Sequence, residues 1–152
     1  MNRLFTRLAI AGTVGSLLTT NPTAAQTLPP AKKAAHVEII KGPELESARD
    51  EVAIIRWTST NPGGNDAHFA VANYGTDPND LNQVAKSPIR LNRGHAETIF
   101  RVRIEGVKPQ TTYYYKVTSM GAEGASDGIE SPVSQFTTPP PGEVIMNYPQ
   151  PN

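Results

Sequence analysis

The sequence predicts an all-β fold, a seven-stranded antiparallel sandwich in which Greek-key connections join two facing sheets. Short segments rich in Val, Ile, Thr and aromatic residues are separated by turn residues every 8 to 14 positions, a spacing typical of sandwiches and barrels. The 14 Pro and 12 Gly are too many for a helical bundle of 152 residues. After the first 25 residues, no segment keeps the helical period of 3.6.

Seven segments are predicted to be strands, in a single run along the chain. They span residues 36–41, 51–59, 68–74, 83–87, 97–104, 112–119 and 133–138. Gly42 and Pro43 are expected to end the first strand, because Pro has no N–H for a strand ladder. The turn-forming residues 61–65 end the second strand. Pro88 ends the fourth, which we expect to lie at a sheet edge.

Side-chain alternation assigns a core face to most of these strands. In the second strand the core face carries Ala53, Ile55 and Trp57. The fifth strand alternates most clearly, and its core face carries Thr98, Phe100, Val102 and Ile104. The third strand leaves two alternatives open, because Phe69 and Val71 compete for the core with Ala70, Ala72 and Tyr74.

Two terminal regions flank the predicted domain of residues 36–138. Residues 1–25 follow the order of a secretory signal peptide: Arg3 and Arg7 at the start, then an apolar stretch, then small residues before the cleavage point. The apolar stretch of about 11 residues is shorter than the roughly 20 that a membrane-spanning helix needs. Residues 26–35 are expected to form a flexible lead-in, and residues 139–152 a Pro-rich flexible tail.

Charge and cysteine content exclude several classes of partner. The signal peptide holds two of the 14 basic residues and none of the 14 acidic ones, so the mature chain has 12 against 14, a formal charge of −2. A chain with this charge is not expected to bind nucleic acid or an anionic membrane. The absence of Cys excludes disulfides and thiolate metal sites, and in an exported chain it favours a bacterial envelope or secreted protein.

Residues 107–117 and Trp57 carry a resemblance to fibronectin type III domains, which have the immunoglobulin-like fold. The segment VKPQTTYYYKV resembles the turn and strand that mark that family, and Trp57 lies where the family has its core Trp. The resemblance covers residues 36–138. It implies a tyrosine corner in which the hydroxyl of Tyr113 bonds to an upstream carbonyl. The structural core that it implies comprises Trp57, Val107, Pro109, Tyr113, Tyr115 and Val117.

A narrower resemblance links the chain to the N-terminal sandwich of purple acid phosphatases, which is itself fibronectin-like. It is carried by residues 55–60, 72–76 and 102–109, together with Thr111 and residues 113–115. In those enzymes a catalytic domain with two metal ions follows the sandwich. No ligand motif of that domain occurs here, so the resemblance implies the fold and no phosphatase activity.

Two regions are candidates for a binding surface. Arg101, Tyr114 and Lys116 are predicted on outward faces of neighbouring strands, where an Arg could stack on a Tyr. The glycine-rich loop of residues 121–130 is the second region, because it would display Glu123, Asp127 and Glu130. The competing interpretation of both regions is an ordinary solvated surface.

Other apparent sites fail on spacing or on chemistry. The three His residues lie far apart in the sequence and lack the spacing of a metal site, so we predict no metal and no cofactor. Residues 77–81 begin like a calcium loop, but Leu81 stands where a ligand is needed. Arg93-Gly94-His95 differs from the Arg-Gly-Asp adhesion signal in the one residue that supplies a carboxylate. No nucleophile motif or paired acidic cluster suggests an enzyme.

These observations predict an exported, non-catalytic module. We expect it in the periplasm or outside the cell, where it binds another envelope or secreted protein, or a polysaccharide, or acts as a spacer. The alternative is an accessory domain of a secreted hydrolase, or a carbohydrate-associated module, related to the N-terminal domain of purple acid phosphatases but without its two metals.

Overall fold

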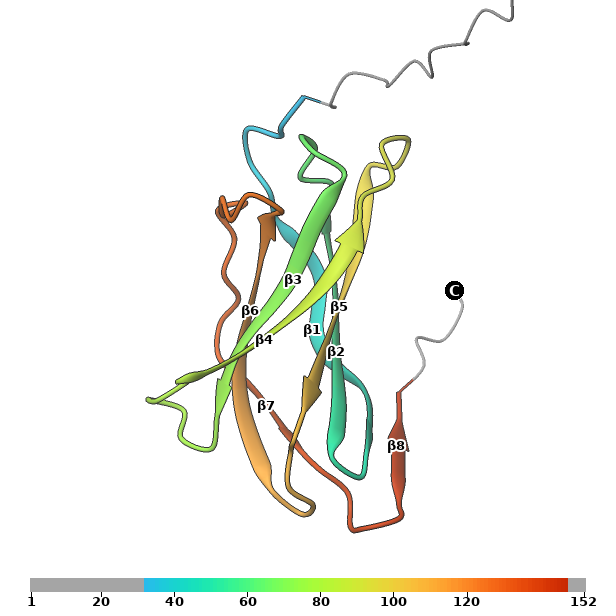
Figure 1. Cartoon of the computed structure of the whole chain (residues 1–152), viewed down its shortest axis with the longest axis vertical. Coiled ribbons are helices and arrows are strands. Elements are labelled where there is room, and N and C mark those ends of the chain that lie inside the picture. Colours follow the sequence, from blue (N-terminus) through green and yellow to red (C-terminus); the bar gives the residue numbers. More distant parts are fainter. Residues whose placement is uncertain (1–31, 148–152) are drawn as a thin grey trace, which may run out of the picture.

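A computed structural model describes residues 32–147, which form eight strands and, over that range, no helix (Figure 1). The strands are β1 (Ile39–Arg49), β2 (Val52–Thr60), β3 (Ala67–Gly75), β4 (Gln83–Arg90), β5 (Glu97–Glu105), β6 (Thr112–Gly121), β7 (Ser134–Thr137) and β8 (Val144–Met146). The predicted signal peptide lies outside these residues. The prediction of an all-β fold is confirmed, with one strand more than expected.

The strands form two antiparallel four-stranded sheets that face each other. One sheet has the order β5-β2-β1-β8 and the other the order β4-β3-β6-β7. The chain therefore crosses between sheets from β2 to β3, from β4 to β5, from β5 to β6 and from β7 to β8. These crossings make a Greek-key sandwich of the immunoglobulin-like type. We call the first the β2 sheet and the second the β3 sheet.

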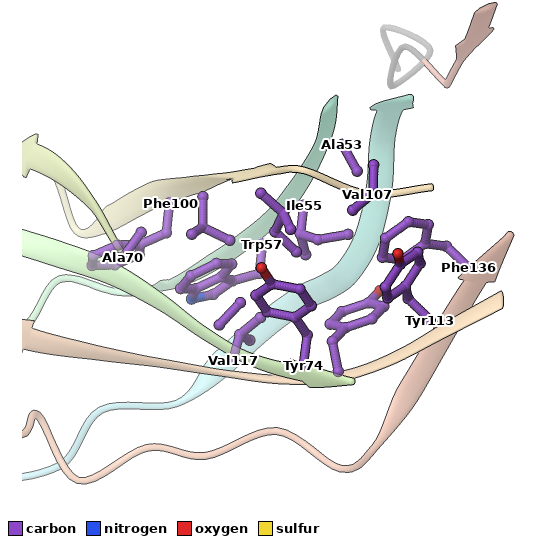
Figure 2. Packing of buried hydrophobic residues seen from close by; sticks show 14 of the residues in the cluster. Ala53, Ile55, Trp57, Ala70, Tyr74, Phe100, Val107, Tyr113, Val117 and Phe136 are labelled. Carbon is purple, nitrogen blue, oxygen red and sulfur yellow. The ribbon is translucent and has the colours of Figure 1, made fainter. Parts of the chain in front are cut away.

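Alternating apolar side chains from both sheets fill the space between them (Figure 2). Trp57 of β2 is 1% exposed, and its ring stacks on Phe100 of β5 with centroids 5.3 Å apart. Tyr113 of β6 stacks on Phe136 of β7 with centroids 5.6 Å apart. Each large aromatic ring buries roughly 150–250 Å² of surface, so these pairs dominate the core of a chain without disulfides.

The structure resolves the two alternatives for the third strand. Ala70, Ala72 and Tyr74 face the core, and their partners across the β3–β6 ladder are Ser119, Val117 and Tyr115. Small Ala side chains on β3 leave room for the indole of Trp57, which lies between the sheets in Figure 2. Phe69 is on the opposite, outward face, half-buried.

Strand β1 differs from the prediction that Gly42 and Pro43 would end it. It continues to Arg49, and the register with β2 shifts three times, between Ile39 and Lys41, between Lys41 and Glu44, and between Leu45 and Ser47. A bulge leaves a residue outside the ladder, so a Pro there removes no ladder bond. Gly42 has φ +80°, a conformation that glycine adopts without strain.

The C-terminal region also differs from the predicted flexible tail of residues 139–152. Residues 144–146 form β8, which pairs antiparallel with Ser47, Ala48 and Arg49 at the edge of β1. The Asn147 N–H donates to the Glu46 carbonyl over 2.8 Å and extends the contact by one residue. β8 therefore covers the edge of β1 at its C-terminal end, from Glu46 to Arg49, where the backbone groups would otherwise be unpaired.

The described end of the lead-in is likewise bonded to the domain. The Ala34 N–H donates to the Pro62 carbonyl over 2.8 Å, and Val37 is 4% exposed. None of residues 32–147 belongs to a helix of the length and apolarity that crossing a membrane requires.

Candidate functional site

Five of the six residues predicted for the structural core are buried. Trp57, Val107, Tyr113, Tyr115 and Val117 are each at most 4% exposed. Pro109 is the exception, because it is exposed in the turn between β5 and β6. It precedes Gln110, which has φ +49° at the tip of that turn. Pro109 therefore shapes the connection between the two sheets from outside the core.

Tyr113 forms a corner with the opposite hydrogen-bond polarity to the one predicted. Its hydroxyl accepts the N–H of Lys108 over 2.9 Å, whereas the sequence suggested a bond to a carbonyl. The hydroxyl of Thr138 donates a hydrogen bond to the carbonyl of Lys108 over 2.5 Å. Tyr113 and Thr138 together tie the β5–β6 turn to the end of β7.

The predicted binding face of Arg101, Tyr114 and Lys116 does not exist as one surface. Arg101 is on β5 in the β2 sheet, whereas Tyr114 and Lys116 are on β6 in the β3 sheet. The chain crosses between the sheets after β5, so the two strands are neighbours only in sequence. Both cations have acidic partners: Arg101 bonds Glu46 and Lys116 bonds Glu130, each at 2.6 Å.

The predicted binding loop displays two of its three acidic residues. Glu123 and Glu130 are exposed, but the carboxylate of Asp127 is buried beneath the loop. It accepts the hydroxyl proton of Ser119 over 2.7 Å and lies 3.3 Å from Nε2 of His68. Asp127 therefore anchors the loop to β3 and β6 at the upper end of the core and is not available to a partner.

Ser119, His68 and Asp127 do not form a catalytic triad. A triad needs the imidazole between the hydroxyl and the carboxylate, so that it can take the hydroxyl proton. Here the carboxylate lies between the other two, and all three side chains are buried. Within residues 32–147, no three His, Asp or Glu side chains gather in a group that would hold a metal ion.

A polar cavity at the upper end of the sandwich was not predicted as a site. It is lined by residues of the lead-in, the β2–β3 loop and the β4–β5 loop, which are all at the upper end of the sandwich in Figure 1. Its volume is about 190 Å³, and we call it the loop cavity. Its lining comprises Lys32, Asn61, Gly63, Gly64, Asp66, Leu91, Arg93 and His95.

Asn61 organises the loop cavity. Its side-chain amide donates to the carbonyls of Asn92 and His95, each over 2.9 Å, and its side-chain oxygen accepts the N–H of Gly63 over 3.0 Å. One side chain thus joins the β2–β3 loop to the β4–β5 loop. Asn is common in turns because its short side chain bonds nearby backbone in this way.

Gly63 brings the lead-in against this frame. Its φ is +64°, and a Cβ atom at this position would lie 2.2 Å from the carbonyl oxygen of Lys32. Only glycine permits both the backbone conformation and the close approach. The neighbouring bond from Ala34 to Pro62 fixes Lys32 at the wall of the cavity.

Asp66 is the acidic residue of the loop cavity, and it holds Arg93 in place. Nε of Arg93 donates to Oδ1 of Asp66 over 2.5 Å, and Arg90 approaches the other carboxylate oxygen at 3.6 Å. The hydrogen bond from Arg93 lowers the pKa of Asp66 below its usual value, and the charges of both Arg residues act in the same direction. Asp66 therefore stays ionised into the acid range.

The sequence drew attention to one segment of the loop cavity but did not indicate that this segment lines a cavity. In the sequence, Arg93-Gly94-His95 stands out only because it resembles the Arg-Gly-Asp adhesion signal. The structure supplies a carboxylate from another loop, but Asp66 is paired with Arg93 and does not replace the missing Asp. No local pattern could reveal a site built from segments that start at residues 32, 61 and 91.

The strand order and the aromatic core define a fibronectin type III-like module. Residues 43–138 match the family described as the purple acid phosphatase N-terminal domain. The match spans more than half of the chain, and the chain belongs to this family. The resemblance inferred from the sequence is confirmed, and the matched unit is the non-catalytic module of those enzymes. Strand β8 and Lys32, the lead-in residue of the loop cavity, lie outside the matched residues.

Comparison with solved structures finds likenesses of low identity. The sensor domain of the anti-sigma factor RsgI4 of Pseudobacteroides cellulosolvens is 20% identical, with 77% of this chain and 97% of that chain covered and a TM-score of 0.42. The fn3 domain of human contactin 1 is 12% identical, with 89% and 97% covered and a TM-score of 0.37. The FN5 domain of Drosophila Lar is 17% identical, with 66% and 98% covered and a TM-score of 0.36. No curated protein matches the chain.

Proposed function

We propose that the protein is an exported, non-catalytic module that binds another envelope or secreted protein or holds such proteins apart. The family match over residues 43–138 supports this proposal, because the matched unit is a module attached to an enzyme and not its catalytic part. The closed core supports it as well. Stacked aromatic rings fill the space between the sheets, so the rigid outer surfaces are what the domain offers to a partner.

Export is the second part of the proposal. It rests on the signal-like order of residues 1–25, and the destination is the periplasm or the medium of a bacterium. The experiment is expression of the full chain followed by fractionation and N-terminal sequencing. We expect a product in the envelope or secreted fraction that begins at Gln26. A full-length product retained in the cytoplasm would contradict export.

An accessory role beside a secreted hydrolase is the more specific alternative. The family match favours it, since the related module accompanies a phosphatase. Capture from the envelope fraction with the purified protein separates the two roles. An accessory domain should recover a hydrolase, and a spacer or a module for another partner should not.

The outward face of the β3 sheet is the surface to test first, because the aromatic side chains of Tyr114 and Phe69 are partly exposed there. Tyr114→Ser should weaken capture of the partner. Ile99→Ser is the matched control, because Ile99 is 43% exposed on the outward face of the other sheet. Equal capture by the wild type and both variants would show that the partner binds elsewhere. Turnover of a phosphomonoester by the purified protein, abolished by a single substitution, would refute a non-catalytic role.

A further inference from the structure

We propose that the loop cavity is a binding site for a small monocarboxylate. Its volume of about 190 Å³ is below the roughly 300–1,000 Å³ of sites that hold drug-sized molecules. It therefore suits a single acidic sugar or a molecule of similar size. The site is independent of the protein-binding surfaces discussed above, and its presence or absence leaves that proposal unchanged.

The charge of the lining favours a monoanion. Lys32 and Arg93 contribute two positive charges and Asp66 one negative charge, which leaves a net charge of +1. Arg90, whose guanidinium lies 3.6 Å from the Asp66 carboxylate, adds a further positive charge next to the cavity. A carboxylate complements this balance, whereas a dianion would meet more repulsion from Asp66. The lowered pKa of Asp66 keeps its carboxylate ionised at mildly acidic pH.

Two donors in the lining have no hydrogen-bond partner in the described part of the chain. Among residues 32–147, no group bonds the ammonium of Lys32 or the imidazole of His95. Charge-assisted hydrogen bonds to a carboxylate are about twice as strong as neutral ones, so the Lys32 ammonium is the main source of affinity. The amide of Asn61 is occupied by two loop carbonyls and serves to position the wall.

The cavity is also preorganised, which reduces the cost of binding. Asn61 joins two loops, Asp66 holds Arg93, and the bond from Ala34 to Pro62 holds the lead-in. In addition, the Leu91 N–H donates to the Asp66 carbonyl over 2.8 Å, so the acidic residue is fixed through its backbone as well. All of these contacts are between groups of the protein itself.

The experiment is an NMR titration of the purified protein with D-glucuronate. D-glucose is the matched probe, because it has the same ring and no carboxylate. We expect saturable shifts of the amide signals of Gly63, Gly64 and Gly94 with glucuronate and none with glucose. Equal shifts with both sugars, or no shifts with glucuronate, would overturn the proposal. Inorganic phosphate that shifts these signals while glucuronate does not would overturn the assignment to a carboxylate.

Substitution then tests the role of the main donor. Lys32→Gln should weaken glucuronate binding about tenfold, because a hydrogen bond to a charged group is lost. Lys41→Gln is the control, since Lys41 is an exposed lysine on β1 outside the cavity. Unchanged fluorescence of Trp57 shows that both variants are folded. Affinity that survives Lys32→Gln, or that falls equally in Lys41→Gln, would contradict the site.

Discussion

Tyr115 is expected to make the fold sensitive to alkali. Its side chain is 1% exposed between the sheets, and its hydroxyl donates to the carbonyl of Pro43 over 3.3 Å. Burial raises the pKa of Tyr115 to about 12, although a hydrogen bond from Ser134 acts in the opposite direction. The folded state therefore favours the neutral phenol, whereas the unfolded chain ionises near pH 10.

The size and sign of the effect follow from linkage. A difference of two pKa units corresponds to about 3 kcal/mol of stabilisation. Because the folded-state pKa of Tyr115 is the higher one, this stabilisation is complete below about pH 10 and disappears as the pH rises towards 12. Tyr74 has a pKa that burial raises in the same direction, so the wild-type protein alone cannot isolate the contribution of Tyr115.

The assay is urea unfolding of the wild type and of Tyr115→Phe at pH 8 and pH 12. The Phe variant keeps the ring and all other ionisable groups, so they cancel in the comparison. Between the two pH values the wild type should lose about 2–3 kcal/mol more unfolding free energy than the variant. Equal losses in the two proteins would refute the claim that a buried phenol at position 115 controls alkaline stability.

Four further substitutions test the packing and the loop anchors, each by urea unfolding. Trp57→Ala should cost about 3–5 kcal/mol, because it leaves a cavity opposite Phe100; a loss below 1 kcal/mol would contradict core packing. Tyr113→Phe should cost about 1–2 kcal/mol, because the Lys108 N–H loses its acceptor. Asp127→Ala should cost about 1–3 kcal/mol, because Ser119 and His68 lose their buried partner. Gly63→Ala should cost more than Gly124→Ala, since both glycines have positive φ but only position 63 faces a carbonyl at 2.2 Å.

β2 and β5, whose alternation is clean, were predicted from the sequence to within one residue at each end. β6 runs two residues further than predicted, and β4 continues through Pro88 to Arg90, because an edge strand tolerates Pro. β5 is the best case, because its core side chains occupy every second position and its ladder with β2 runs unbroken from Glu97 to Glu105. β1 was predicted too short, because the three shifts in its register break the alternation and accommodate Pro43. Local pattern is reliable where the backbone is regular and fails where bulges interrupt the period.

Features that depend on how distant segments are brought together could not be predicted from local sequence patterns. β8 has three residues, too few to show a period, and it exists because the edge of β1 is open to pairing. Arg101 and Tyr114 were predicted on neighbouring strands of one sheet, yet the chain changes sheet between β5 and β6. The loop cavity combines three separate segments, so only the folded structure brings Lys32 to Asp66 and Arg93.

The central claim is that the two sheets close over a filled core and leave the protein its outer surfaces for binding. Trp57 reports on this directly, because it is the one Trp of the chain and is 1% exposed. Acrylamide quenching of its fluorescence in the native protein should be weak and should increase sharply after unfolding in urea. Native quenching as strong as that of the unfolded chain would mean that the indole is in water and that the core described here does not exist.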